Sequence, residues 1–306
     1  MAAAPAKPFL KWAGGKTHLL DSLRTVYPAG LGDTVCKYAE PFVGGGAVLF
    51  DLLAAYRMKQ VYIGDSSPQL INAYLAVRDH VEELVERLSP MEEIFHLLDS
   101  QARRAYYNAQ RTRFNRRMAA GHPLGVEDAA LLIFLNRTCF NGLYRVNRRG
   151  LFNVPMGAYR NPMICDGDNL RACSALLQGV EIVCGDYQAC APFVDEHTFV
   201  YFDPPYRPLS PTSSFTAYTS QSFNDGDQEA LARFARELAG RGALVALSNS
   251  DPRSVCPEDD FLERIYDGFT IKRVQAARMI NSKAAARGAV SELLITSYPA
   301  PGGAGQ

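Results

Sequence analysis

The stretch EPFVGGGAVLFDLL, residues 40–53, places three consecutive glycines between a strand-like run and a helix-like run. A glycine turn at the end of a strand lets the backbone approach a ligand closely, as it does in nucleotide-binding α/β folds. The stretch departs from the dinucleotide fingerprint G-x-G-x-x-G, because Leu49 stands where the third glycine belongs. We therefore expect Gly44 and Gly46 to approach a ligand that is not held through its pyrophosphate.

An acidic residue supports this interpretation. Asp65 lies nineteen residues after Gly46 and ends the next strand-like run, VYIGDSS. A carboxylate at that place can accept hydrogen bonds from ribose hydroxyls. The glycine turn and the acid together indicate a nucleoside-type cofactor, although each signal alone is equally compatible with a structural role.

Beyond this stretch, apolar runs alternate with helical ones, which predicts the α/β class. The clearest helices begin at the Ser67–Pro68 cap and at about Asp225. The alternation stops over 79–168, which predicts an inserted domain with a hairpin at about 140–157. The main domain then comprises 1–78 and 169–298, followed by a disordered tail, 299–306. The strands are expected at 35–42, 61–64, 180–184, 198–202, 243–248, 264–271 and 291–298.

Charge is distributed unevenly in a chain whose formal net charge is zero. Residues 101–160 contain eleven arginines, and their only acids are Glu127 and Asp128. Such a basic segment in an acidic body favours contact with a polyanion, with a solvated helical face as the alternative. No apolar run approaches the length of a membrane helix, and we do not expect a signal peptide, because the N-terminal stretch lacks a basic region followed by an apolar one. The seven cysteines lack C-x-x-C spacing, which favours reduced thiols in the cytoplasm and no metal site.

The run TFVYFDPPYRP, residues 198–208, is the strongest chemical signal. Asp203 and the Pro204 carbonyl offer acceptors only, the two prolines stiffen the turn, and Tyr206 adds a flat face. Two fixed acceptors beside a stacking surface suit the amino group of a planar heterocycle such as adenine or cytosine. The alternative is an ordinary turn after a strand with an exposed aspartate.

Two other stretches carry a signal. NRTCFNGLYRVNRRGLFNVPMG, residues 136–157, is rich in Arg and Asn, which read base edges, and an aromatic such as Phe140 could wedge between base pairs. A surface hairpin without a partner is the alternative. FLKWAGGKTH, residues 9–18, ends like a phosphate-binding loop, but Leu10 occupies the position of its first glycine.

These motifs, taken in order with LSNSD and SELLITSY, resemble the alpha-group, or D12 class, DNA adenine-N6 methyltransferases of the Dam family. The resemblance covers nearly the whole chain. It implies a class I S-adenosylmethionine-dependent methyltransferase fold, with a seven-stranded Rossmann-like sheet and an inserted helical target-recognition domain. It also implies S-adenosyl-L-methionine as cofactor and double-stranded DNA as partner, with no metal, no membrane and a monomeric chain in a bacterial, archaeal or phage-infected cytoplasm.

The resemblance also assigns site residues. The catalytic residues are Asp203, Pro204 and Tyr206. The expected cofactor contacts are Trp12, Lys16, Gly44, Gly46, Asp65, Asp186 and Asp203, with Asp186 near the adenine. The expected DNA contacts are Lys11, Phe140, Asn141, Leu143, Arg145, Pro155 and Tyr159, with Phe140 as the intercalating aromatic. This set makes GATC the expected target, although Ala158 stands where the family often carries a basic residue.

The expected reaction is transfer of a methyl group to N6 of a flipped adenine, with residues 207–223 as a lid. Two alternatives stay open. A methyltransferase acting on RNA or on protein amides more often carries Asn in place of Asp203 and would not need the FNGLYR segment. A catalytically silent DNA-binding homologue would not need Asp203, Tyr206, Asp65 and Lys16 intact. The sequence leaves open a solitary role or a role in restriction–modification.

Overall fold

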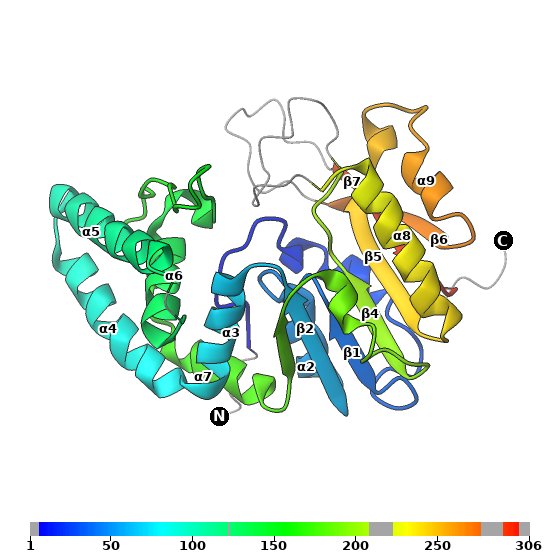
Figure 1. The fold of residues 1–306 in the computed structure, drawn as a ribbon, viewed down its shortest axis with the longest axis horizontal. Helices are drawn as coiled ribbons and strands as arrows, with labels where there is room; N and C mark the ends of the chain where they lie inside the picture. Colours follow the sequence, from blue (N-terminus) through cyan, green and yellow to red (C-terminus); the bar gives the residue numbers. More distant parts are fainter. Residues whose placement is uncertain (1–5, 122, 208–222, 277–289, 300–306) are drawn as a thin grey trace.

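The computed structural model describes residues 6–121, 123–207, 223–276 and 290–299. The loop expected as a lid and the expected C-terminal tail fall outside these ranges, apart from their end residues. The architecture is a seven-stranded sheet in the order β3-β2-β1-β4-β5-β7-β6 with helices on both sides (Figure 1). The strands are β1 Lys37–Glu40, β2 Gln60–Asp65, β3 Glu181–Cys184, β4 Thr198–Phe202, β5 Leu244–Ser250, β6 Thr270–Ala276 and β7 Val290–Thr296.

Strand direction fixes where a ligand can bind. β1 pairs in parallel with both β2 and β4, and the strand order reverses around it. β7 runs antiparallel to both of its neighbours, β5 and β6. In open α/β sheets, ligands bind beyond the carboxyl ends of the strands where the order reverses. The glycine loop after β1, Asp65 of β2 and Asp203 after β4 all lie at that edge. The expected α/β class and seven-stranded sheet are confirmed.

The helices begin largely where the sequence predicts. In α3, Ser67 caps the N-terminus by accepting the N–H of Leu70 at 3.3 Å, and Pro68 is the first residue. The helices of the sheet domain are α1 Leu20–Arg24, α2 Ala47–Ala55, α3 Pro68–Asp79, α7 Gly167–Leu177, α8 Asp225–Gly240 and α9 Phe261–Ile265. Short 3-10 turns complete the fold: η1 Lys16–His18, η2 Phe140–Gly142, η3 Tyr187–Cys190 and η5 Pro252–Ser254.

The strand expected over 264–271 is wrong. Its first half belongs to α9 and the turn that follows, and β6 begins only at Thr270. Leu262, Ile265 and Tyr266 are all buried at helical spacing, so packing on one helical face decides the local structure. Gly268 then adopts φ +85° and turns the chain into β6.

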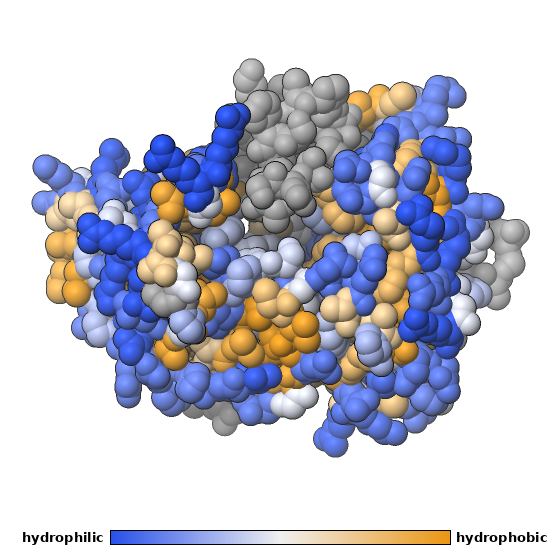
Figure 2. All heavy atoms as spheres, viewed as in Figure 1, coloured by the Kyte–Doolittle hydropathy of each residue, from blue (hydrophilic) through white to orange (hydrophobic). Residues whose placement is uncertain are grey.

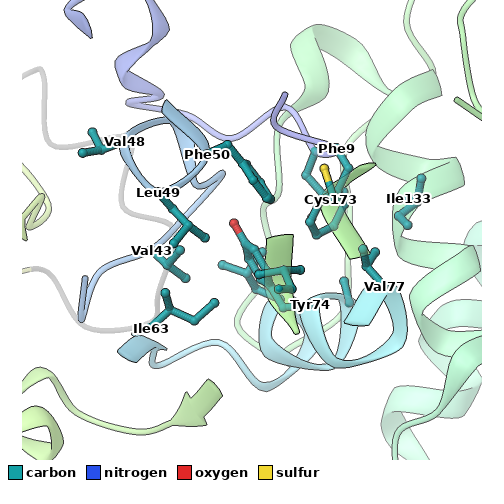
Figure 3. Packing of buried hydrophobic residues seen from close by; sticks show 14 of the residues in the cluster. Phe9, Val43, Val48, Leu49, Phe50, Ile63, Tyr74, Val77, Ile133 and Cys173 are labelled. Carbon is teal, nitrogen blue, oxygen red and sulfur yellow. The ribbon is translucent and has the colours of Figure 1, made fainter. Parts of the chain in front are cut away.

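Three long helices stand to one side of the sheet, α4 Val81–Leu97, α5 Ser100–Ala119 and α6 Val126–Thr138 (Figure 1). α6 joins them to the sheet, since Ile133 shares one core with Tyr74 of α3 and Phe9 of the N-terminal segment (Figure 3). After α6 the chain pairs with itself through two isolated bridges, Cys139 with Met156 and Val146 with Phe152, in place of two full strands. In Figure 2, strongly hydrophilic residues lie among apolar ones over α5 and this segment. Among the described residues, no helix is long and apolar enough to cross a membrane.

Candidate active site

The glycine loop after β1 adopts a conformation that requires its glycines. Gly44 has φ +48° and Gly46 φ +72°, both in the left-handed region. The hydroxyl of Tyr74 donates to the Gly44 carbonyl at 3.0 Å. A Cβ on Gly46 would lie 2.5 Å from that hydroxyl, so any larger residue would displace the tyrosine that holds the loop.

Asp65 fastens the same loop from the end of β2. Its Oδ2 accepts the N–H of Gly44 at 3.2 Å and its Oδ1 accepts the N–H of Ser67 at 2.9 Å. Burial raises the pKa of Asp65 above its ordinary value, and these backbone N–H groups act in the opposite direction. The Asp65 carbonyl also accepts the N–H of Gly185 at 3.1 Å, which places Asp186 on the neighbouring strand end. Asp186 is exposed and caps η3 by accepting the N–H of Gln188 at 2.9 Å.

A hollow lies between the KWAGGK segment and the glycine loop. Its lining includes residues 12–16, Gly44, Gly46 and Asp203. Trp12 lies so close to the loop that a Cβ on Gly44 would be 3.0 Å from its indole Cδ1. Lys16 is 4% exposed, and its Nζ lies 2.8 Å from Asp203 Oδ1. The structure therefore brings Trp12, Lys16, Gly44, Gly46 and Asp203 together in this lining. Asp65 lies outside the lining but holds the loop through Gly44, and Asp186 lies outside it as well.

The D-P-P-Y corner directly follows β4, and its aspartate is held from two sides. Asp203 Oδ1 accepts from Lys16 Nζ and from Ser248 Oγ, the latter at 3.0 Å. Burial raises the pKa of Asp203, and Lys16 opposes the shift. Among the described residues, nothing donates a hydrogen bond to Asp203 Oδ2 or to the Pro204 carbonyl. Two acceptors are thus left at the corner for a ligand.

Tyr206 presents its ring beside the same aspartate. Lys16 Nζ lies 4.4 Å from the ring centroid, and the Tyr206 hydroxyl donates to Glu292 Oε2 at 2.6 Å. His18 approaches the other Glu292 oxygen at 3.6 Å. Because Glu292 lies on β7, the D-P-P-Y corner after β4 is braced against the antiparallel end of the sheet.

Sequence reasoning assigned no role to three side chains here. Glu40, Ser248 and Glu292 lie inside stretches quoted above for other residues. Glu40 is 2% exposed, accepts from the Tyr38 hydroxyl at 2.8 Å, and has a pKa raised well above its ordinary value by burial. All three are polar residues buried within strands of the sheet, and a polar residue inside a strand-like run is the signal that could have marked them.

The expected target-reading residues surround η2. Phe140 is 52% exposed, its N–H donates to the Pro155 carbonyl at 2.9 Å, and Asn141 is left-handed with φ 55°. Lys11 reaches this group from the N-terminal segment, with its Nζ 4.2 Å from the Tyr159 ring centroid. Leu143 and the exposed Arg145 follow η2, and Arg145 Nε donates to Asn153 at 2.9 Å. Within the described ranges, no cluster of three His, Cys, Asp or Glu side chains could hold a metal.

Comparisons with known proteins agree on one family. Residues 12–280 match the model of the D12 class N6 adenine-specific DNA methyltransferases. The type II methyltransferase M.MjaIII of Methanocaldococcus jannaschii is 48% identical, over 95% of this chain and 99% of its own length. The DNA adenine methylase of Haemophilus influenzae is 34% identical, over 94% and 92% of the two chains. The DNA adenine methylase of Escherichia coli K12 is 33% identical, over 96% of each.

Proposed function

Because the chain belongs to the D12 class of N6 adenine-specific DNA methyltransferases, we propose that it methylates N6 of a flipped adenine within GATC in duplex DNA, using S-adenosylmethionine. Adenine methylation of DNA follows from the family itself, whereas the target sequence, the flipping step and the residue roles are the proposal. The observation that carries it is the pair of acceptors at the D-P-P-Y corner, Asp203 Oδ2 and the Pro204 carbonyl, beside the glycine loop.

The hollow suits a nucleoside-type cofactor that donates a methyl group. The left-handed glycines let the backbone approach a ligand, and Trp12 supplies an aromatic wall. We assign the donor to Trp12, Lys16, Gly44, Gly46 and Asp65, with Asp203 facing its reactive side and Asp186 near its adenine. When bound, S-adenosylmethionine supplies an electrophilic methyl group on a sulfonium.

The corner supplies what the target adenine needs. The lone pair of an exocyclic amine is delocalised into the ring, so the amine is a poor nucleophile. Accepting both N6 hydrogens, one at Asp203 and one at Pro204, draws the nitrogen towards a tetrahedral state. Tyr206 stacks on the base, which must leave the helix at a cost of a few kcal/mol. Positioning and fixed acceptors then lower the barrier.

The inserted region supplies the grip on DNA. Arginines of 101–160 are suited to phosphates and predict strongly salt-sensitive binding. Of the expected DNA contacts, Phe140 is the exposed aromatic that can enter the stack, and Arg145 can read a guanine edge. The other base-reading residues are Lys11, Asn141, Leu143, Pro155 and Tyr159. On this assignment 79–168 is the target-recognition domain, and 1–78 and 169–298 form the methyltransferase domain.

The test is radiolabelled methyl transfer to a duplex with one GATC site, followed by identification of the methylated nucleoside. N6-methyladenine confined to GATC is the expected product. Modification of a different adenine site would overturn the target sequence, while modification of RNA with unmodified DNA would favour the alternative substrate. A duplex that is bound but never methylated would favour the silent homologue.

A further inference from the structure

One buried carboxamide joins the two halves of the site. Asn136, in the last turn of α6, is 1% exposed. Its Oδ1 accepts the N–H of Lys11 at 2.8 Å, and its Nδ2 donates to the Lys11 carbonyl at 2.7 Å and to the Gly142 carbonyl at 2.9 Å. Both amide hydrogens and the oxygen are therefore used, and they connect the N-terminal segment to η2.

The segment that Asn136 holds leads directly into the cofactor side. Lys11 precedes Trp12, which packs on Gly44 and stacks on Tyr144, with ring centroids 5.5 Å apart and an interplanar angle of 18°. The next residue of α6, Arg137, donates twice to the Phe9 carbonyl, at 3.1 and 2.8 Å. The backbone that reads the target and the backbone that lines the hollow are thus fixed to the same turn of one helix.

We propose that Asn136 is a positioning residue that locks the target-reading turn and the Lys11–Lys16 segment into one unit, so that the correct sequence is required to align the catalytic corner. The inference rests on the proposed function. It assigns Asn136 no contact with DNA or cofactor, since it acts through Lys11 and Gly142. The consequence is a coupling between sequence recognition and methyl transfer.

The chain offers two matched controls for this carboxamide. Asn169 of α7 clamps Lys7, four residues before Lys11, accepting its N–H at 2.8 Å and donating to its carbonyl at 3.0 Å. Asn115 of α5 clamps Phe152 in the same way, at 2.8 and 3.0 Å. Asn169 binds the N-terminal segment but makes no bond to η2. Asn115 binds the hairpin but makes no bond to the N-terminal segment.

The experiment compares Asn136→Ala with Asn169→Ala and Asn115→Ala. The measured quantity is the ratio of kcat/KM for a GATC duplex to that for duplexes with one base pair changed. Asn136→Ala is expected to lower this ratio about tenfold or more, and to weaken the effect of GATC duplex on the affinity for S-adenosylhomocysteine. Both control variants are expected to stay within about threefold of the wild type.

A second pair of variants keeps the test decisive if Asn136→Ala fails to fold. A Cβ on Gly142, φ +63°, would lie 2.5 Å from Lys11 Cβ, whereas a Cβ on Gly150, φ +73°, meets nothing within 4 Å. Gly142→Ala should therefore separate the turn from Lys11 and lower the discrimination ratio, and Gly150→Ala should not. Unchanged ratios in Asn136→Ala and Gly142→Ala, or equal losses in their controls, would overturn the inference. Failure of the wild type to methylate DNA would instead count against the proposed function.

Discussion

Lys16 Nζ and Asp203 Oδ1 lie 2.8 Å apart in a nearly closed site, and the same ammonium group lies over the Tyr206 ring. The contact fixes one carboxylate oxygen, and none of the described residues donates a hydrogen bond to the other. A segment from the N-terminus and a corner from the middle of the chain thus set the protonation and the orientation of one carboxylate together.

Asp203→Ala should abolish methyl transfer while retaining DNA binding. Removal of one fixed acceptor typically costs about 10²–10³ in kcat, and the loss here also frees Lys16. Single-turnover methylation gives the rate, and fluorescence anisotropy with a labelled duplex gives the affinity. Turnover of Asp203→Ala at the wild-type rate would show that Asp203 has no role in the reaction.

The pH profile should depend on Lys16. Burial raises the pKa of Asp203 and Lys16 opposes this, while the charge of Glu292 raises it further. In the proposed mechanism the carboxylate of Asp203 is the active form, so kcat should fall as the pH drops through this raised pKa. Lys16→Met should move that acid limb to higher pH, and Glu292→Gln should move it to lower pH. The measurement is kcat against pH at saturating DNA and cofactor. If the wild type and both variants lose activity at the same acidic pH, Asp203 is not the group that titrates.

The glycine loop should tolerate no side chain at Gly46. Gly46→Ala carries both a left-handed strain of roughly 1–2 kcal/mol and the clash with Tyr74, which adds about 1–3 kcal/mol. Gly179→Ala is the control, because its φ is +75° and its Cβ would meet nothing within 4 Å. Urea unfolding measures the free energy of unfolding of both variants. Equal losses of stability would show that Tyr74 moves aside at little energetic cost.

Local signals made much of this fold predictable. The cap Ser67–Pro68, the glycine turn after β1 and the D-P-P-Y corner each depend on neighbouring residues, and the structure has a helix, a loop and a corner at these places. The boundary between α9 and β6 was not predictable, because short apolar runs fit either period and packing decided it.

The partners of the site residues were not predictable, because long-range contacts leave no local pattern. Ser248 follows an apolar run in β5, and Asn136 follows an apolar run in α6. A polar residue at such a place is equally compatible with a satisfied core group. Only the sheet order brings Ser248 beside Asp203, and only the packing of α6 brings Asn136 to Lys11.

The brace on Tyr206 should matter less than its ring. Tyr206→Phe keeps the stacking surface and loses the 2.6 Å bond to Glu292, so a loss of about tenfold in kcat is expected. Tyr206→Ala should lose more, because base–aromatic stacking contributes about 1–3 kcal/mol. A duplex with 2-aminopurine at the target reports flipping by its fluorescence. Equal rates for the two variants would show that the ring does not stack on the base.

Arg145 and Arg148 should separate sequence reading from phosphate binding. Arg145 follows the target-reading turn and is oriented by Asn153, so Arg145→Ala should relax the choice of site by about 1–3 kcal/mol at one base pair. Arg148 is exposed at the hairpin tip, and none of the described residues holds its side chain in this way. Arg148→Ala should therefore weaken binding to all DNA sequences evenly and lower the salt dependence of binding by about 1. Binding and methylation of GATC and single-change duplexes at several salt concentrations distinguish the two. Because the two arginines carry the same charge in the same segment, an even effect from both would make Arg145 a phosphate contact, and the base-reading role would pass to other residues of the turn.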